Sequence, residues 1–176
     1  SMREVWLIVL FLALSILLAD QFSSSFCKPY FARFRPAQDP LLMYIVDVVE
    51  GYRGGRYGFI SSHAANTFAV CIFLALLIRN GWITFSLVLW ATLCSYSRIY
   101  LGVHYPGDIL FGGLWGLLTG FLVYMACAYL LRKISQNRVF VSEQYTSTGY
   151  SVADLEVFQA VLYLTYVILA IRAVVI

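Results

Sequence analysis

Long apolar runs separated by short polar stretches dominate the chain, and they predict membrane-crossing helices. The first run, residues 5–19, is uncharged and ends at Asp20. About twenty apolar residues cross a bilayer, so we expect this helix to continue through Phe22 toward Cys27, with Asp20 facing protein or the interface. The pattern then turns polar, and residues 23–61 are predicted to form a long loop.

Further apolar runs occupy residues 64–78, 82–96, 109–131 and 157–171. Serines before the first of these are good helix N-caps, and the run 109–131 is long enough to cross a bilayer outright. The chain is therefore predicted to be an all-α, polytopic transmembrane helix bundle with about five spanning helices. The apolar stretch at residues 41–49 suits a short additional helix lying in the membrane interface.

Three glycines inside the run 109–131 recur every four residues, at Gly112, Gly116 and Gly120. Residues at this spacing share one face of a helix. Small residues on one face let a neighbouring helix approach closely. The sequence therefore predicts a tight helix contact along this stripe, which concerns packing and says nothing about chemistry.

The composition agrees with a membrane location. Of the 176 residues, 61% are hydrophobic and 12% are charged, whereas a soluble domain carries about 25% charged residues. The net charge of +3 is scattered, without the basic patch that nucleic acid requires, so we expect no nucleic-acid partner. The four cysteines stand singly and three lie in apolar runs, which indicates neither a zinc site nor a disulfide framework.

The whole chain, residues 1–176, is interpreted as a single transmembrane domain. Its core is residues 5–131, a polar linker follows at residues 132–153, and an additional C-terminal span occupies residues 154–176. Alternation of the spans places the loop 23–61 and the loop before residue 109 on the same side of the membrane.

A histidine, an arginine and a carboxylate crowd together between apolar runs in residues 97–108. Glycine and proline in this stretch predict a tight loop. His104 and Asp108 stand four apart, and a helix beginning near Pro106 would bring them close. A carboxylate beside an imidazole holds its tautomer and raises its basicity, as histidine requires when it acts as nucleophile or base. Arg98 adds a fixed cation suited to phosphate; the alternative is an ordinary polar loop at the membrane surface.

The conspicuous polar residues all fall on the side of these two loops, namely Lys28, Arg35, Ser61, His63, Arg98, His104 and Asp108. This set includes both histidines of the chain. Arg33, Arg53 and Arg56 are interpreted as solvated or lipid-headgroup residues. Asn66 is expected to make an interhelical hydrogen bond.

These residues resemble the signatures of the type 2 phosphatidic acid phosphatases, membrane relatives of glucose-6-phosphatase and the vanadium haloperoxidases. The family pattern K-x6-R-P is met by Lys28, Arg35 and Pro36, and the pattern S-R-x5-H-x3-D by Ser97, Arg98, His104 and Asp108. The pattern P-S-G-H appears as Ile60, Ser61, Ser62 and His63, so its proline and glycine are replaced. The resemblance covers about residues 5–131.

The resemblance implies a lipid phosphatase that uses no metal cofactor. His104 would attack phosphorus to form a phosphohistidine, Asp108 would orient it, and His63 would protonate the leaving group. The residues that would hold the phosphate oxygens are Lys28, Arg35, Ser61, Ser62 and Arg98. Phosphoryl transfer needs such cations and an acid opposite the nucleophile, and no acidic cluster has magnesium or zinc ligand spacing.

The implied partners are a lipid phosphate substrate and the surrounding membrane lipids, and no oligomeric state follows. Family-like substrates include phosphatidic acid, phosphatidylglycerophosphate, undecaprenyl diphosphate and lipid A, of which we favour a polyprenyl diphosphate or phosphatidylglycerophosphate. Because serine replaces the family's glycine at Ser62, a lipid-headgroup binding or transport protein with weakened catalysis is the alternative. A haloperoxidase is disfavoured by the lipid-embedded scaffold. The family commonly has two further spans before the lysine pattern; either they precede this sequence, or the C-terminal span completes the bundle.

Positive residues also suggest an orientation. The side away from the two polar loops carries Arg3, Arg79, Arg132, Lys133 and Arg138. Positively charged loops stay in the cytoplasm, so we expect a bacterial inner-membrane protein whose active site faces the periplasm or exterior. Cys27, the only cysteine expected in a loop, would then be accessible from that side.

Overall fold

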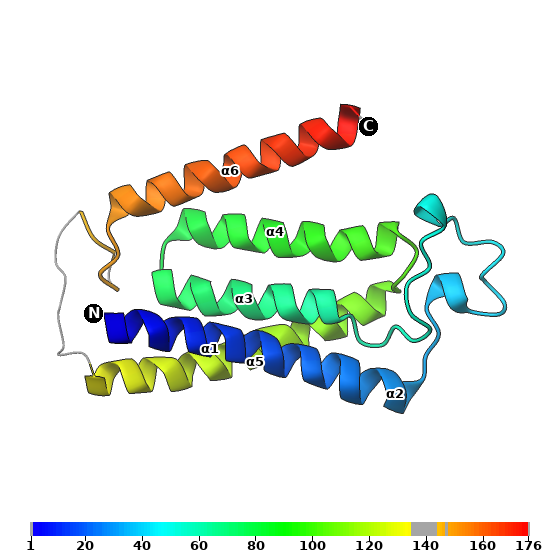
Figure 1. The fold of residues 1–176 in the computed structure, drawn as a ribbon, viewed down its shortest axis with the longest axis horizontal. Coiled ribbons are helices and arrows are strands. Elements are labelled where there is room, and N and C mark those ends of the chain that lie inside the picture. Colours follow the sequence, from blue (N-terminus) through cyan, green and yellow to red (C-terminus); the bar gives the residue numbers. More distant parts are fainter. Residues whose placement is uncertain (1, 135–143, 147, 176) are drawn as a thin grey trace.

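The computed structural model describes residues 2–134, 144–146 and 148–175, with side chains as far as residue 168. Within these ranges the regular elements are all helices, which confirms the all-α fold class. Figure 1 shows the long helices running side by side between two opposite ends of the bundle.

The first apolar run forms one continuous helical segment of 30 residues. It consists of α1 (Met2–Gln21), the π-helical turn η1 (Phe22–Cys27) and α2 (Lys28–Phe31). The hydroxyls of Ser23 and Ser24 donate to the Asp20 carbonyl oxygen at 2.9 and 2.6 Å, so the helix itself satisfies these polar groups. The expected continuation of the helix toward Cys27 is therefore confirmed. The prediction of a loop beginning at residue 23 was wrong, and the loop starts only at Ala32, whose φ is 45°.

Cys27 lies inside this helical segment and not in a loop. It is the last residue of η1 and is 3% exposed. The expectation that Cys27 is an accessible loop cysteine was wrong, because the serine-rich stretch before it stays helical.

The other apolar runs each form one helix that extends beyond the run. These are α3 (Ser62–Ile78), α4 (Gly81–Tyr100), α5 (Pro106–Ile134) and α6 (Val152–Val175). Side chains cap three of them: Ser61 Oγ accepts from the Ala64 amide, Asn80 Oδ1 from the Ile83 amide, and Ser151 Oγ from the Asp154 amide. Among the described residues, the α1–α2 segment and α5 are long and apolar enough to qualify alone as membrane spans. The count of five spans stays a prediction.

The short interfacial helix expected at residues 41–49 is not formed. Residues 40–45 make hydrogen-bonded turns, and a 3-10 turn, η3, covers only Val49–Gly51. Positive φ angles at Glu50 and Gly51 prevent a right-handed helix from continuing there. The loop is braced instead by Arg53, expected to be solvated, which donates to the carbonyl oxygens of Ala37 and Met43 at 2.8 and 3.1 Å.

Helices α3 and α5 lie in close backbone contact. A methyl group on any of the three stripe glycines would collide with a carbonyl oxygen at the start of or within α3: Gly112 with Ser61, Gly116 with Ala65, and Gly120 with Ala69. The predicted close approach is therefore confirmed, and α3 is the partner helix.

A polar pair joins α1 to α3 inside the apolar bundle. Asn66 Nδ2 donates to Asp20 Oδ1 at 3.1 Å. This contact confirms that Asn66 is an interhelical hydrogen bonder and that Asp20 faces protein. The contact satisfies the Asn66 amide nitrogen and one Asp20 oxygen, whereas Asn66 Oδ1 is buried without a hydrogen-bond partner.

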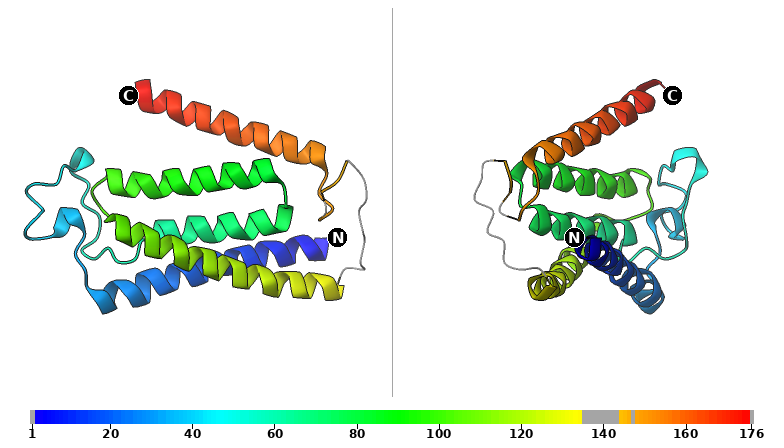
Figure 2. Two further views of the ribbon diagram at one scale, coloured as in Figure 1. Left: turned by 180° about the vertical axis from the view of Figure 1, so that it is seen from behind. Right: turned by 60° about the vertical axis from the view of Figure 1, so that its left-hand side comes forward.

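Helix α6 meets the bundle through α4. Leu155 near its start packs in a core cluster with Ile83 and Leu87. Farther along, the Ser86 hydroxyl donates to Tyr163 Oη at 3.1 Å, and Tyr166 Oη donates to the Ser86 carbonyl oxygen at 3.2 Å. Figure 2 shows α6 diverging from α4 toward the C-terminus.

Both polar loops lie at the same end of the bundle, as the alternation of helices predicts. The N-terminus and the α3–α4 turn lie at the opposite end (Figure 1). Two backbone hydrogen bonds connect the loops directly: Ala37 N donates to Gly102 O at 3.1 Å, and Ser61 N to Asp108 O at 3.0 Å. The chain therefore gathers its polar residues around one shared end.

Replacing a stripe glycine should separate α3 from α5. We expect Gly116→Val to destabilise the protein by about 2 kcal/mol or more, because its side chain would press on backbone that cannot rotate away. A thermal melt in detergent should show a clearly lower Tm. Gly81→Val is the matched control, since a Cβ at Gly81 meets nothing within 4 Å; equal melting temperatures for the two variants would contradict the contact.

Candidate functional site

Two arginines reach the loop end of the bundle from an extended segment after α2. Backbone hydrogen bonds pair this segment with residues 56–58 in an antiparallel bridge between Phe34 and Tyr57. Alternate side chains of an extended segment point to opposite faces. Arg33 and Arg35 therefore share one face, turned toward α5, while the ring of Phe34 lies against Tyr57.

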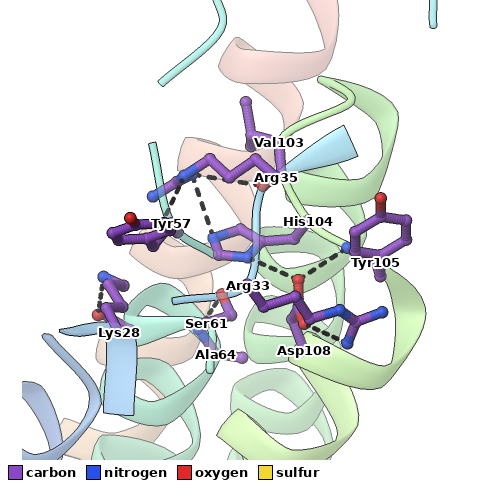
Figure 3. Close-up of polar contacts among 11 residues, drawn as sticks. Lys28, Arg33, Arg35, Tyr57, Ser61, Ala64, Val103, His104, Tyr105 and Asp108 are labelled. Atoms are coloured by element: carbon purple, nitrogen blue, oxygen red, sulfur yellow. Dashed lines mark hydrogen bonds and ion pairs between the residues drawn. The ribbon is translucent and has the colours of Figure 1, made fainter. Parts of the chain in front are cut away.

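The start of α5 supplies a buried imidazole–carboxylate pair. Pro106 suits the first position of a helix, so the helix begins there and brings Asp108 back toward the preceding loop. His104 Nδ1 lies 3.4 Å from Asp108 Oδ2, which also accepts the Tyr105 amide at 3.0 Å. His104 is 3% exposed and Asp108 is 0% exposed. The spacing of four residues thus gives the predicted contact (Figure 3).

The second ring nitrogen of His104 faces Arg35. Arg35 Nη1 lies 3.4 Å from His104 Nε2 and 3.4 Å from the Val103 carbonyl oxygen, and Arg35 Nε donates to Tyr57 O at 3.1 Å. A guanidinium can only donate, so Nε2 must be the acceptor and Nδ1 must carry the hydrogen toward Asp108. The contacts therefore assign a tautomer whose free lone pair points at a cation.

The environment keeps this imidazole neutral. Burial lowers the pKa of His104 below its usual value; the hydrogen bond with Asp108 raises it, and Arg35 and Lys28 lower it further. The lowering effects dominate, because desolvation disfavours the charged ring. Near pH 7 the Nε2 lone pair is available.

Lys28 is held by a hydroxyl that the family pattern lacks. Its Nζ donates to Ser62 Oγ at 2.6 Å, and the hydroxyls of Ser62 and Ser23 lie 2.9 Å apart. The sequence placed Ser62 among the residues that would hold phosphate oxygens and did not predict this contact of its side chain with Lys28. The hydroxyl fixes the lysine ammonium at the N-terminus of α3.

Ser61 joins the two helices at the site. Its Oγ accepts from the Ala64 amide at 3.4 Å, and its own amide donates to the Asp108 carbonyl oxygen. The hydroxyl hydrogen of a capping serine is still free to be donated. The predicted phosphate contact of Ser61 would therefore coexist with its role as helix cap.

His63 and Arg98 lie at the same end of the bundle, and among the described residues neither side chain is hydrogen-bonded to the His104–Asp108 pair. His63 precedes the uncharged part of α3, and Arg98 lies in the last turn of α4, where its Nε donates to Ser97 Oγ at 3.2 Å. Partial burial lowers the pKa of His63, and the charges of Arg98, His104, Lys28 and Arg35 lower it further. His63 is thus within electrostatic range of Arg98, Lys28 and Arg35.

Arg33 is the residue that sequence reasoning missed. Its Nη1 lies 3.1 Å from Asp108 Oδ1, and its guanidinium stacks 4.3 Å from the centre of the Tyr105 ring. The Arg33 side chain is 46% exposed, so the expectation of a solvated arginine holds for part of the group, but its pairing with Asp108 was not expected. The available signal was its position two residues before Arg35, which puts both side chains on one face of an extended segment.

The charge of the site comes from cations around a single buried carboxylate. Among the described residues, no three His, Cys, Asp or Glu side chains gather where they could hold a metal ion. Four cationic side chains, those of Lys28, Arg33, Arg35 and Arg98, lie at the end that contains Asp108. Such an arrangement suits an anion with several oxygens.

The helices of the bundle are apolar, and at their loop end a neutral imidazole lies close to several cations. These two features define a class of protein, namely membrane proteins suited to anion chemistry. Residues 5–132 match the PAP2 superfamily, and the chain belongs to this family. The match agrees with the resemblance carried by the sequence patterns, although one of the three patterns is incomplete.

Several relatives have names that specify an activity. The lipid A 4'-phosphatase of Porphyromonas gingivalis is 45% identical over 127 residues, which are 72% of this chain and 54% of the relative. The lipid A 4'-phosphatase of Bacteroides thetaiotaomicron is 43% identical over 133 residues, 73% of this chain and 58% of the relative. The undecaprenyl-diphosphatase BcrC of Bacillus subtilis is 39% identical over 66 residues, 38% of this chain and 33% of the relative.

The chain spans about half the length of the lipid A 4'-phosphatases that it matches. No solved structure matches it.

The contact with Asp108 should be visible in the titration of His104. We expect His104 to titrate below about 6.5, and Asp108→Asn to lower its pKa further, because the carboxylate is what raises it. NMR of protein labelled at histidine would measure both, with His63→Asn assigning the two signals. Asp39→Asn is the control, since that carboxylate contacts Tyr105 Oη; an upward shift in Asp108→Asn would contradict the assignment.

Proposed function

We propose that this protein is an integral-membrane lipid phosphatase that transfers a phosphoryl group to His104 and then to water, without a metal ion. One observation carries the proposal: Asp108 engages Nδ1 of His104, while Nε2 keeps a lone pair that faces Arg35. The proposed nucleophile, His104 Nε2, therefore lies beside a cation, the Arg35 guanidinium, as phosphoryl transfer requires. The names of the relatives, lipid A 4'-phosphatase and undecaprenyl-diphosphatase, support the same class of reaction.

In the first step, Nε2 of His104 bonds to phosphorus and the bond from phosphorus to the lipid oxygen breaks. The ring gains positive charge as the new bond forms. Asp108 stabilises that charge and keeps the Nδ1 hydrogen in place, which is the role of the carboxylate behind a histidine in other enzymes. The product of this step is a phosphohistidine.

The cations neutralise the charge on the phosphate oxygens. Arg35 already lies beside Nε2, and Lys28 and Arg98 complete the set. The N-terminus of α3 adds backbone amides and the positive end of a helix dipole. Ser61 and Ser62 contribute hydroxyls at that terminus.

His63 acts as acid and then as base. Bound phosphate offsets the cations that lower the pKa of His63, so the ring is protonated when substrate is present. It gives this proton to the leaving lipid oxygen. The neutral ring then takes a proton from water, which attacks the phosphohistidine and releases inorganic phosphate.

A lipid A phosphate monoester is the substrate we propose first. The polyprenyl diphosphate and phosphatidylglycerophosphate favoured from the sequence come after it. The reason is the extent of similarity: the two lipid A 4'-phosphatases align with 72% and 73% of this chain, whereas BcrC aligns with 38%.

A second candidate is a protein that binds lipid phosphate headgroups with weakened catalysis. The contact of 2.6 Å between Lys28 Nζ and Ser62 Oγ favours it. The Lys28 ammonium, which a phosphate would need, donates a hydrogen bond to this hydroxyl. The hydroxyl belongs to Ser62, which stands where the family pattern has glycine. If the lysine cannot leave the hydroxyl, the site would bind an anion but stabilise the transition state poorly.

Phosphate release from lipids in detergent separates the two candidates. We expect release from lipid A, at least about 10³-fold slower in His104→Asn because the nucleophile is lost. A thermal melt would show that the variant is folded. Vanadate should inhibit and EDTA should not.

The contrary outcomes are distinct. Lipid binding without phosphate release would favour the binding protein. Full activity in His104→Asn would remove His104 as nucleophile, and complete loss of activity in EDTA would contradict the metal-free reaction.

We also propose that the site faces the periplasm, because Arg79, Arg132 and Lys133 lie toward the opposite end of the bundle. Cysteine labelling in intact cells tests this orientation. We expect a membrane-impermeant maleimide to label Gly55→Cys in the polar loop but not Gly81→Cys, until the membrane is permeabilised. An added Cβ meets nothing within 4 Å at either glycine, and the parent protein controls for its own cysteines. The reverse labelling pattern would invert the orientation.

A further inference from the structure

The two oxygens of the buried Asp108 carboxylate have different partners. Oδ2 meets His104 Nδ1 at 3.4 Å and the Tyr105 amide at 3.0 Å. Oδ1 meets Arg33 Nη1 at 3.1 Å. Figure 3 shows the carboxylate between the imidazole and the guanidinium. Arg33 thus contacts the carboxylate that orients His104. Among the described residues, Arg33 makes no hydrogen bond with the His104 imidazole itself.

Arg33 is itself fixed on two sides. Its carbonyl oxygen accepts the Gly58 amide at 2.9 Å, and its guanidinium stacks on the Tyr105 ring. The Tyr105 hydroxyl in turn donates to Asp39 Oδ2 at 3.4 Å. A guanidinium that is paired with a carboxylate and stacked on an aromatic ring has little freedom left.

We propose that Arg33 is a positioning residue that acts through Asp108, holding the carboxylate in the orientation in which its other oxygen meets His104. The role rests on the proposed function of His104 as nucleophile. A buried carboxylate with one unpaired oxygen is strongly disfavoured, and without Arg33 the group would turn toward water or another donor. Arg35 is directed elsewhere, because its Nε meets Tyr57 O and its Nη1 meets Val103 O and His104 Nε2.

Removing Arg33 should also change the charge that His104 experiences. The guanidinium shares the negative charge of Asp108, so its loss leaves a stronger anion beside Nδ1 and favours the protonated ring. The other charged groups around His104 remain: Asp108 on α5, Lys28 and Arg35 before α3, His63 on α3 and Arg98 on α4. The expected shift in Arg33→Gln is therefore upward, opposite to that in Asp108→Asn.

Arg33→Gln is the test variant. We expect kcat to fall roughly tenfold because the nucleophile is less well oriented, with KM within about twofold. The acidic limb of kcat/KM should move to higher pH, since this limb reports the free enzyme. Arg33→Lys should restore most of kcat, because an ammonium can still pair with Oδ1. If Arg33→Gln does not fold, Arg33→Lys must show smaller shifts in the same directions.

Arg56→Gln is the matched control. Arg56 lies in the same loop, is exposed and stacks on the rings of Phe34 and Tyr57, so its removal should change neither kcat nor the pH limb. A raised KM with unchanged kcat in Arg33→Gln would make Arg33 a phosphate ligand and overturn the proposal. An unchanged kcat and pH limb would overturn it as well.

A second measurement separates this inference from the proposed function. The titration of His104 by NMR needs no substrate and can be followed in Arg33→Gln and in the unmodified protein. If the unmodified protein releases no phosphate, the proposed function fails, yet an upward shift of the His104 pKa still supports the coupling through Asp108. An unchanged pKa overturns the coupling whether or not the protein is an enzyme.

Discussion

The contact between α3 and α5 fixes the geometry of the loop end. Glycines along α5 let its backbone rest against that of α3, and the Ser61 amide donates to the Asp108 carbonyl oxygen at this contact. His63 lies at the start of α3 and Asp108 at the start of α5. The contact between the two helices therefore fixes the position of these residues relative to each other, although they are far apart in the sequence. Bulkier residues would hold the helices apart, because a core packed to crystal density cannot absorb extra atoms without moving backbone.

The chemistry of the site follows from the burial of one carboxylate. Asp108 is removed from water and surrounded by donors from the loop after α2, from the Tyr105 amide and from His104. These contacts determine the tautomer of His104 and direct its lone pair away from Asp108. Burial of the imidazole keeps the ring neutral against the opposing effect of Asp108, so the anion orients the proposed nucleophile and desolvation keeps its lone pair unprotonated.

Ser62, which replaces the glycine of the family pattern, contacts Lys28 in the structure. The helical segment continues through three serines, which carries the lysine to the N-terminus of α3, where Ser62 supplies an oxygen at 2.6 Å. One N–H of the Lys28 ammonium is therefore donated to the Ser62 hydroxyl. The competition between this oxygen and a phosphate oxygen is what distinguishes the two candidate functions.

The sequence by itself determined the features that depend on local geometry. Helix positions follow from the length of the apolar runs, the glycine stripe from the pitch of a helix, and the His104–Asp108 contact from a spacing of four beside a proline. The tertiary structure decided the rest. Arg33 and Arg56 each precede an aromatic residue, and only the pairing of residues 33–35 with residues 56–58 turns Arg33 toward Asp108 and Arg56 outward. The sequence could not show this, because the direction of a long side chain depends on contacts between segments that meet only in the folded chain.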